Sequence, residues 1–268
     1  MSQPQAPTPL LESIAMLADL RKEVESQLDT VDWASQSHAD TELLAFMQLA
    51  IGNVAAIETL AKTDVRFVMP GTAAARAAYE VVVTATWMVA TTDLAERDRR
   101  WMALFLDERK FWRTLSKEAL ERQDPEPIVK TIETELRRVE TMIADFQPQL
   151  DAVGGGTAKP MPQFDDLLQQ VGKRRIYVVY KTACQIVHPA TRALSLVRDL
   201  KDAHSNEPPV ATFGYRTTER DWTTAVLLGA ASLSFGLETL TRWLQAPQMS
   251  PRALGLFNSI VAKVKTFR

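Results

Sequence analysis

Cysteine is nearly absent from this chain of 268 residues, because Cys184 is the only one. A single cysteine excludes an internal disulfide and a zinc site built from several cysteines, and it is typical of proteins that live in a reducing compartment. The first residues, MSQPQAPTPLLES, also lack the basic and apolar regions of a signal peptide. We therefore predict a cytoplasmic location.

An excess of charge of one sign is also missing. The chain has 31 Lys and Arg against 33 Asp and Glu, a formal net charge of −2. This balance excludes a protein that binds nucleic acid through overall positive charge, although it leaves a local basic patch open. The longest uncharged run, 222–237, contains serine and threonine and is shorter than the roughly 20 residues that cross a bilayer. We predict a buried helix there and no membrane partner.

Glycine is scarce, with 10 residues, and no stretch alternates as a strand would. Apolar residues instead recur at helical spacing through most of the chain. We predict an all-α fold in which residues 9–268 form a single multi-helix bundle after a disordered tail, 1–8. The expected helices are one of about 20 residues from Leu10, and then 41–62, 72–91, 94–122, 126–150, 164–171, 174–187, a continuation to about 201, 219–244 and 250–265.

Turn residues predict how these helices are connected. Asp40 is a candidate N-cap for the second helix, and Met69-Pro70-Gly71 should separate the second helix from the third. Asp124-Pro125 should turn the chain between helices 94–122 and 126–150, which are then expected to form a long antiparallel hairpin. The Gly/Pro-rich stretch 151–163 is predicted to be a loop within the same domain.

Ionisable side chains occupy apolar helix faces in two places. Arg76 and Glu80 are four residues apart on a helix that is apolar nearly all round. Glu108 lies on the apolar stripe of the next helix, between Phe105 and Trp112. A carboxylate in such a position costs several kcal/mol without a partner. We therefore expect these charges to be paired.

The stretch 173–200 contains the cysteine, two of the four tyrosines and a His-Pro step. Tyr180, Cys184 and His188 are four residues apart, so they line one face of a helix. One interpretation is that they meet Arg76, Glu80 and Glu108 in a polar cluster that orders the bundle or binds a small ligand. The other is that the tyrosine and cysteine simply pack in the core while His188 ends its helix.

The Arg76–Glu80 helix followed by Tyr180-x-x-x-Cys184-x-x-x-His188 resembles an uncharacterised family of bacterial all-helical proteins over roughly residues 41–244. That family usually has serine at the position of Cys184, so this chain lacks the hydroxyl there. The resemblance implies a bacterial helical protein without an established activity. We predict no cofactor and no metal site, because paired Glu-x-x-His motifs are missing.

A second resemblance is to the HEPN ribonucleases, helical proteins of toxin and antiphage defence modules. Their signature is an arginine followed a few residues later by a histidine near a helix end. Lys181 stands at the cation position before His188 in this chain, and lysine does not give the same bidentate phosphate contact. The resemblance implies metal-independent RNA cleavage with His188 and Lys181 as catalytic residues. Arg174 and Arg175 are then candidates for further phosphate contacts.

A third interpretation is an interaction scaffold. Trp101, Phe111 and Trp112 of the predicted hairpin would supply contact area for a protein partner or a second copy of the chain. RNA is a partner only under the ribonuclease interpretation. The sequence leaves the ligand-binding, ribonuclease and scaffold functions open.

Overall fold

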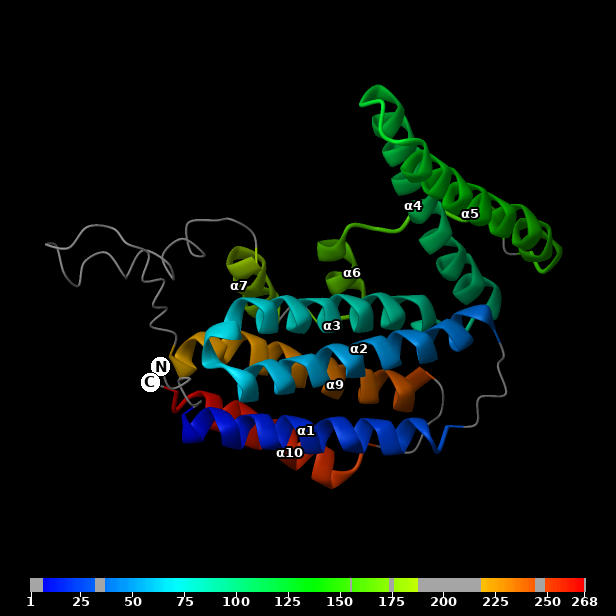
Figure 1. The fold of residues 1–268 in the computed structure, drawn as a ribbon. Helices are drawn as coiled ribbons and strands as arrows, with labels where there is room; N and C mark the ends of the chain where they lie inside the picture. Colours follow the sequence, from blue (N-terminus) through cyan, green and yellow to red (C-terminus); the bar gives the residue numbers. More distant parts are fainter. Residues whose placement is uncertain are drawn as a thin grey trace, which may run out of the picture. The chain divides into compact units, whose positions relative to one another are not determined.

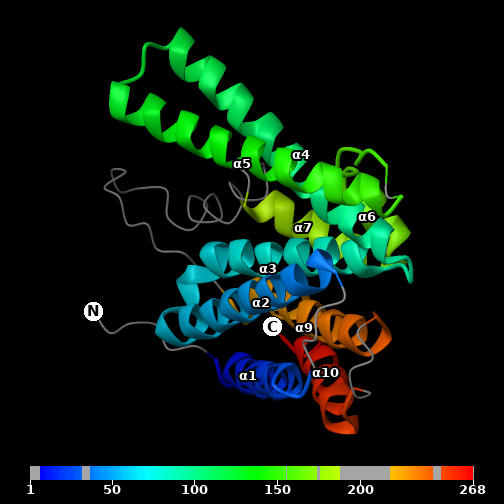
Figure 2. The same ribbon diagram turned by 90° about the vertical axis from the view of Figure 1, so that its right-hand side faces the viewer.

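The computed structural model describes residues 7–31, 37–154, 156–173, 176–187, 218–243 and 249–267. The regular elements in these ranges are all helical, so the predicted all-α class is confirmed. Figures 1 and 2 show the helices in two orientations.

The described residues fall into two compact units. We call the residues within 1–32, 44–84 and 168–268 the core unit, and those within 33–43 and 85–167 the hairpin unit. Helices α2 (His38–Thr63) and α3 (Val68–Val89) supply residues to both units. The single domain predicted from the sequence remains a prediction, and it requires that the two units unfold together.

Three helices of the core unit pack against one another (Figure 1): α1 (Thr8–Leu28), α9 (Thr223–Trp243) and α10 (Pro251–Val264). A short 3-10 helix, η3 (Glu219–Trp222), leads into α9. In α9, 14 of 21 residues are buried. Since α9 is apolar nearly all round, it can be packed on every side, and the predicted buried helix is confirmed.

The break between the second and third helices comes earlier than predicted. α2 ends at Thr63, and the 3-10 helix η1 (Val65–Phe67) follows, capped by the Asp64 carboxylate, which accepts the Arg66 backbone N–H at 2.8 Å. Met69-Pro70-Gly71 is therefore not a break, because it lies in the first turns of α3. Proline is tolerated in a first turn, where backbone N–H groups have no intrahelical partner.

Trp222 explains why the last residue of Met69-Pro70-Gly71 is glycine. Its indole is fully buried, and Nε1 donates to the Val65 carbonyl at 2.8 Å. A β-carbon at Gly71 would lie 2.5 Å from this ring. Gly71 is thus needed for a close helix contact and not for a chain reversal.

The start of α2 also differs from the prediction. The helix begins at His38, and the Ser37 hydroxyl accepts the Asp40 backbone N–H at 3.2 Å, so the predicted N-cap role of Asp40 is wrong. Asp40 lies inside the first turn. Its carboxylate accepts a hydrogen bond at 2.7 Å from Arg97, and both side chains are buried. The N-cap position is taken by serine because the carboxylate is used for this ion pair.

The predicted hairpin is present as α4 (Leu94–Glu121) and α5 (Glu126–Ala152), which lie side by side in Figures 1 and 2. Asp93 caps α4 by accepting the backbone N–H groups of Ala95 and Glu96. The hairpin has a small apolar cluster of its own, formed by Met102, Leu150, Ala158, Phe105, Leu106, Ile143 and Phe146. Only three of the 27 residues of α5 are buried.

Two shorter helices follow, α6 (Phe164–Gln170) and α7 (Tyr177–Val187). α7 begins three residues later than predicted. Arg174 and Arg175 lie outside the described residues. His188 and the predicted continuation of this helix to residue 201 lie outside them as well.

Two segments are long and apolar enough to cross a membrane by length and composition alone, His38–Thr63 and Glu219–Trp243. In the structure 33% and 78% of their apolar windows are buried. Buried core helices pass the same test, so this finding is weak evidence, and the absence of a membrane partner stays a prediction.

Candidate functional sites

The structure brings three of the predicted site residues together between α3 and α7. Arg76 Nε donates to Glu80 Oε1 at 2.7 Å, one helical turn away. The Tyr180 hydroxyl donates to the same oxygen, also at 2.7 Å, across 100 residues of sequence. The Arg76 guanidinium carbon lies 5.9 Å from the centroid of the Tyr180 ring. We call these three residues, together with Cys184 one turn further along α7, the α3–α7 cluster.

The buried side of α7 holds Tyr180 in place. Tyr180, Ala183 and Ile186 are its buried residues, and α7 packs against α9. The Tyr180 ring is 6.1 Å from the Tyr79 ring of α3 at a tilted angle. Only 5% of Tyr180 is exposed, so its hydroxyl is fixed in its orientation toward Glu80.

The surroundings keep the Tyr180 hydroxyl neutral and the Arg76 guanidinium charged. Burial raises the pKa of Tyr180 far above its ordinary value, and the hydrogen bond to Glu80 and the nearby Cys184 raise it further. Burial lowers the pKa of Arg76, but the hydrogen bond and charge of Glu80 outweigh this effect, so the net pKa is raised. Tyr180 is therefore a donor to a carboxylate at any pH near neutrality.

Glu80 retains an unused acceptor. Both hydrogen bonds end on Oε1, and among the described residues Oε2 has no hydrogen-bond partner. The Glu80 side chain is 33% exposed and that of Arg76 is 24% exposed. The cluster is thus partly open to molecules in solution and is not a fully buried ion pair.

Glu108 finds its partners within the hairpin unit. Its carboxylate accepts hydrogen bonds from Arg138 at 2.5 Å and from Trp112 Nε1 at 3.1 Å. Arg138 also binds Glu135, which is the largest cause of its raised pKa. The partner that a carboxylate on an apolar stripe requires is therefore Arg138, a residue that the sequence analysis did not single out.

The ribonuclease candidates are only partly described. His188, Arg174 and Arg175 lie outside the described residues. Lys181 is exposed on α7, with its Nζ 4.9 Å from the centroid of the Tyr177 ring. Lys181 follows the buried Tyr180 in the sequence, so its side chain points about 100° away from that of Tyr180 around the helix. Lys181 thus belongs to the outer side of α7.

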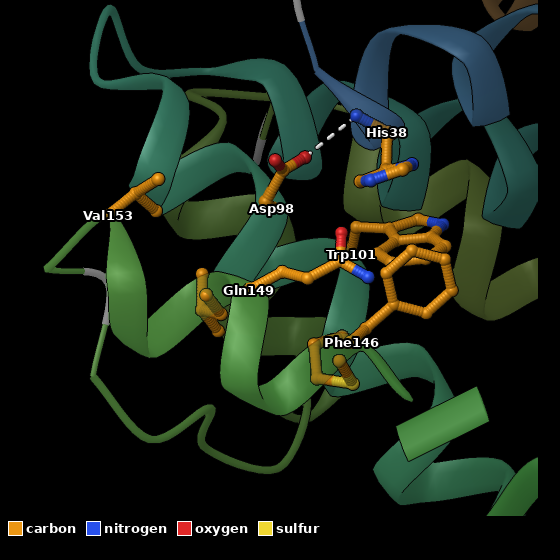
Figure 3. Close-up of a pocket in the computed structure, with 8 residues that line it drawn as sticks. His38, Asp98, Trp101, Phe146, Gln149 and Val153 are labelled. Atoms are coloured by element: carbon orange, nitrogen blue, oxygen red, sulfur yellow. Dashed lines mark hydrogen bonds between the residues drawn. The ribbon is translucent and has the colours of Figure 1, made fainter. Parts of the chain in front are cut away.

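The hairpin unit contains a pocket that the sequence analysis missed (Figure 3). Its volume is about 150 Å³, and it is lined by His38, Asp98, Trp101, Met102, Phe146, Gln149, Leu150 and Val153. His38 is exposed and is the first residue of α2.

The aromatic residues of this pocket are packed on one another. The His38 ring stacks on the Trp101 indole, with 4.8 Å between centroids and 19° between planes. Phe146 meets both rings edge to face at 4.7 and 4.8 Å. Trp101 Nε1 donates to the Glu42 carboxylate at 3.4 Å. These contacts fix the aromatic wall before any ligand arrives.

Asp98 gives the pocket its charge. Its Oδ1 accepts the backbone N–H groups of His38 and Ala39 at 2.8 and 3.4 Å, the first of which is drawn in Figure 3. Asp98 therefore helps to cap α2 from a position 60 residues away in sequence, a contact that no local motif indicates. Among the described residues, no group of three or more His, Cys, Asp or Glu side chains is placed to hold a metal ion.

Comparison with known proteins gives one match. The model of a family of unknown function, DUF5677, matches residues 43–206. This is more than half of the chain, and it includes every residue of the α3–α7 cluster. No curated protein and no solved structure matches. The predicted membership of an uncharacterised helical family agrees with this match.

Proposed function

Because the chain belongs to DUF5677, a family of unknown function, we propose a function from the site itself: the α3–α7 cluster binds a small polar ligand. We place this function in the bacterial cytoplasm, as the single cysteine and the family resemblance led us to expect. The activity is binding at Arg76, Glu80 and Tyr180, with Cys184 and His188 further along the same chain segment.

The observation that carries this proposal is the second oxygen of Glu80. Arg76 and Tyr180 fix the carboxylate through Oε1, and Oε2 has no hydrogen-bond partner among the described residues. A carboxylate held in one orientation binds a donor with little loss of conformational entropy. Its partial burial also makes a hydrogen bond there stronger than one at a fully exposed carboxylate.

The ligand class follows from this chemistry. The ligand must donate a hydrogen bond to Glu80, so it carries a hydroxyl or an amino group. The neighbouring Arg76 cation favours a ligand that also carries an acceptor or a negative charge. Nucleosides, nucleotides, sugars and amino acids meet both conditions.

The test is a thermal unfolding survey with those four groups of compounds as probes. The comparison is between the wild type, Glu80→Gln and Tyr180→Phe. Glu238→Gln is the matched control, because it removes a carboxylate that pairs with Lys173 elsewhere in the core unit. A ligand at about 100 times its dissociation constant stabilises the folded state by about 2.7 kcal/mol.

We expect that at least one probe raises the unfolding temperature of the wild type and of Glu238→Gln. The same probe should raise the unfolding temperature of Glu80→Gln less. Gln retains an oxygen that accepts from Tyr180, so this variant should fold. A wild type that is well folded and is stabilised by none of the probes contradicts the proposal. So does a probe that acts equally on all variants.

The exposed Lys181 favours a second candidate, the ribonuclease function. A lysine on the outer side of α7 is accessible to a phosphate, and His188 is seven residues further along the sequence. If this function holds, mixed RNA is cleaved without metal, and His188→Ala abolishes cleavage. Lys181→Arg should raise the rate, because arginine adds a bidentate phosphate contact. An intact RNA substrate after incubation with folded wild type excludes it.

Exposed apolar side chains of the hairpin favour a third candidate, the scaffold function. Phe111, Leu120 and Ile128 are 57%, 60% and 49% exposed in α4 and α5. A contiguous exposed apolar patch marks a protein contact surface, and this candidate requires that these side chains form one. Light scattering of the wild type and of Leu120→Lys tests this candidate. A monomeric wild type that retains no partner on affinity purification argues against it.

A further inference from the structure

We propose that the pocket of the hairpin unit binds a small organic ammonium ion. This inference is independent of the function proposed for the α3–α7 cluster, since it rests on other residues. The ligand would place its ammonium group against Asp98 and Gln149, and its apolar part against Trp101, Leu150 and Val153 (Figure 3).

Besides the His38 ring, which stacks on Trp101, the polar side chains of the lining offer acceptors. Asp98 uses Oδ1 to cap α2, and Oδ2 has no hydrogen-bond partner among the described residues. Gln149 uses its Nε2 to donate to the Asp145 carbonyl at 3.1 Å, and its Oε1 has no partner within the described part of the chain. Two acceptors and no lysine or arginine in the lining select a ligand that donates hydrogen bonds and carries positive charge.

The arginines that neighbour Asp98 in the sequence pair with other carboxylates. Arg97 pairs with Asp40 at 2.7 Å. Arg100 pairs with Glu96 at 2.9 Å, donates to the Trp87 carbonyl at 2.6 Å, and lies over the Trp87 ring. No side chain among the described residues forms an ion pair with Asp98. Its charge is met within the described residues by the N-terminus of α2, and its Oδ2 is available to a cationic ligand.

The remaining walls define the apolar part of the ligand. Trp101 and Leu150 are 6% and 5% exposed, so a substituent that covers them is removed from water. A volume of about 150 Å³ holds roughly five waters, which is room for a ligand of roughly five to seven non-hydrogen atoms. A short alkylammonium ion fits both the chemistry and the size.

The experiment is an NMR titration of the full-length protein with n-butylammonium chloride, followed at the indole N–H signals. The Trp101 signal is assigned with Trp101→Phe. Butan-1-ol is the neutral isostere and sodium butyrate is the anion of similar size. We expect saturable shifts of the Trp101 signal with n-butylammonium, affinity at least about tenfold lower for butan-1-ol, and no saturable binding of butyrate.

Two variants test which residue supplies the negative charge that binds the ligand. Asp98→Asn keeps an oxygen that can cap α2 but removes the negative charge, and it should lower the affinity for n-butylammonium about tenfold. Gln149→Glu adds a second carboxylate and should raise the affinity. Asp107→Asn is the matched control, because it removes the same charge nine residues along α4, on the opposite face.

Several outcomes overturn the proposal. One is a wild type whose Trp101 signal does not move with n-butylammonium. Another is equal binding of butan-1-ol, which shows a merely apolar cavity. Unchanged affinity in Asp98→Asn, or an Asp107→Asn variant as weak as Asp98→Asn, also contradicts it. If Asp98→Asn does not fold, an affinity that fails to rise in Gln149→Glu decides against the proposal.

Discussion

The core unit and the hairpin unit are stabilised in different ways, although both are made of helices. In α9 of the core unit 14 of 21 residues are buried, whereas in α5 of the hairpin unit three of 27 are buried. α9 contributes to stability through apolar burial and close contact between helices. α5 relies on a small apolar cluster and on local helix formation.

The surface of the hairpin also differs from the packed helices of the core unit. The hairpin carries a series of surface ion pairs, such as Arg113–Glu140 and Arg122–Glu118, whose side chains are more than a third exposed. In the core unit, small residues allow side chains of other helices to approach: a β-carbon at Gly236 would lie 2.3 Å from Met47. Substitutions should therefore be costly in the core unit and tolerated on the hairpin surface.

The largest effect is expected for Gly71→Ala. Its new methyl group would meet the Trp222 ring at 2.5 Å, and a buried indole with a hydrogen bond to Val65 has no room to move. We expect a loss of about 2–4 kcal/mol in the free energy of unfolding, measured by urea denaturation.

Gly52→Ala is the control for the same chemical change. Gly52 lies within α2, and a β-carbon there would meet nothing within 4 Å. The variant should be more stable by about 0.5–1 kcal/mol, because alanine favours the helix. A Gly71→Ala variant as stable as the wild type would show that the Trp222 contact is not tight.

The next effect tests whether the two units form one domain. Leu150→Ala removes a buried side chain from the apolar cluster of the hairpin, and it should cost about 2–3 kcal/mol. Because α2 and α3 supply residues to both units, we expect the loss to appear throughout the chain. Hydrogen exchange measures it separately for α5 and α9. Unchanged protection in α9 would show that the units unfold independently.

A smaller effect is expected for Tyr180→Phe, which removes one hydrogen bond to the partly exposed Glu80 carboxylate and should cost about 1 kcal/mol at neutral pH. The pKa of Tyr180 in the folded state is above its ordinary value of 10.0. The folded state thus holds the proton more tightly than the unfolded state, and stability is full below that value and falls as pH rises above it.

The variant should therefore show a shallower loss of stability than the wild type in alkaline solution. Urea denaturation at about pH 8 and at about pH 10.5 measures this difference. Tyr79, whose pKa is also raised by burial, continues to contribute in both proteins. Parallel losses in the wild type and Tyr180→Phe would mean that Tyr180 is not held as described.

The smallest effect is expected for Arg113→Ala on the hairpin surface. The Arg113–Glu140 pair has side chains that are 58% and 38% exposed, so water and salt screen it. The change in unfolding free energy should be below about 0.5 kcal/mol. A loss as large as that of Leu150→Ala would contradict the distinction between the two units.

The sequence predicted the helices and the hairpin well because apolar spacing reports directly which faces are covered. It failed where a contact comes from a distant residue. Pro70 and Gly71 suggested a break, but Gly71 is there for Trp222. Asp40 suggested a cap, but it pairs with Arg97.

Contacts from distant residues also limited the prediction of the candidate sites. Arg76 and Glu80 could be paired from their spacing, and one of the two interpretations of the sequence placed Tyr180 beside them. Glu108 had the same need, but no pattern identified Arg138 as its partner. The sequence did not predict the pocket at Asp98, because its residues come from three helices and share no spacing.

The most direct test of the central claim, that the α3–α7 cluster binds a polar ligand, is a calorimetric titration with the probe that most stabilises the wild type. We predict an affinity at least about tenfold lower in Glu80→Gln than in the wild type, because the acceptor charge is lost. Glu238→Gln should bind like the wild type. Equal affinity in Glu80→Gln and the wild type would contradict the claim and leave the cluster a purely structural role.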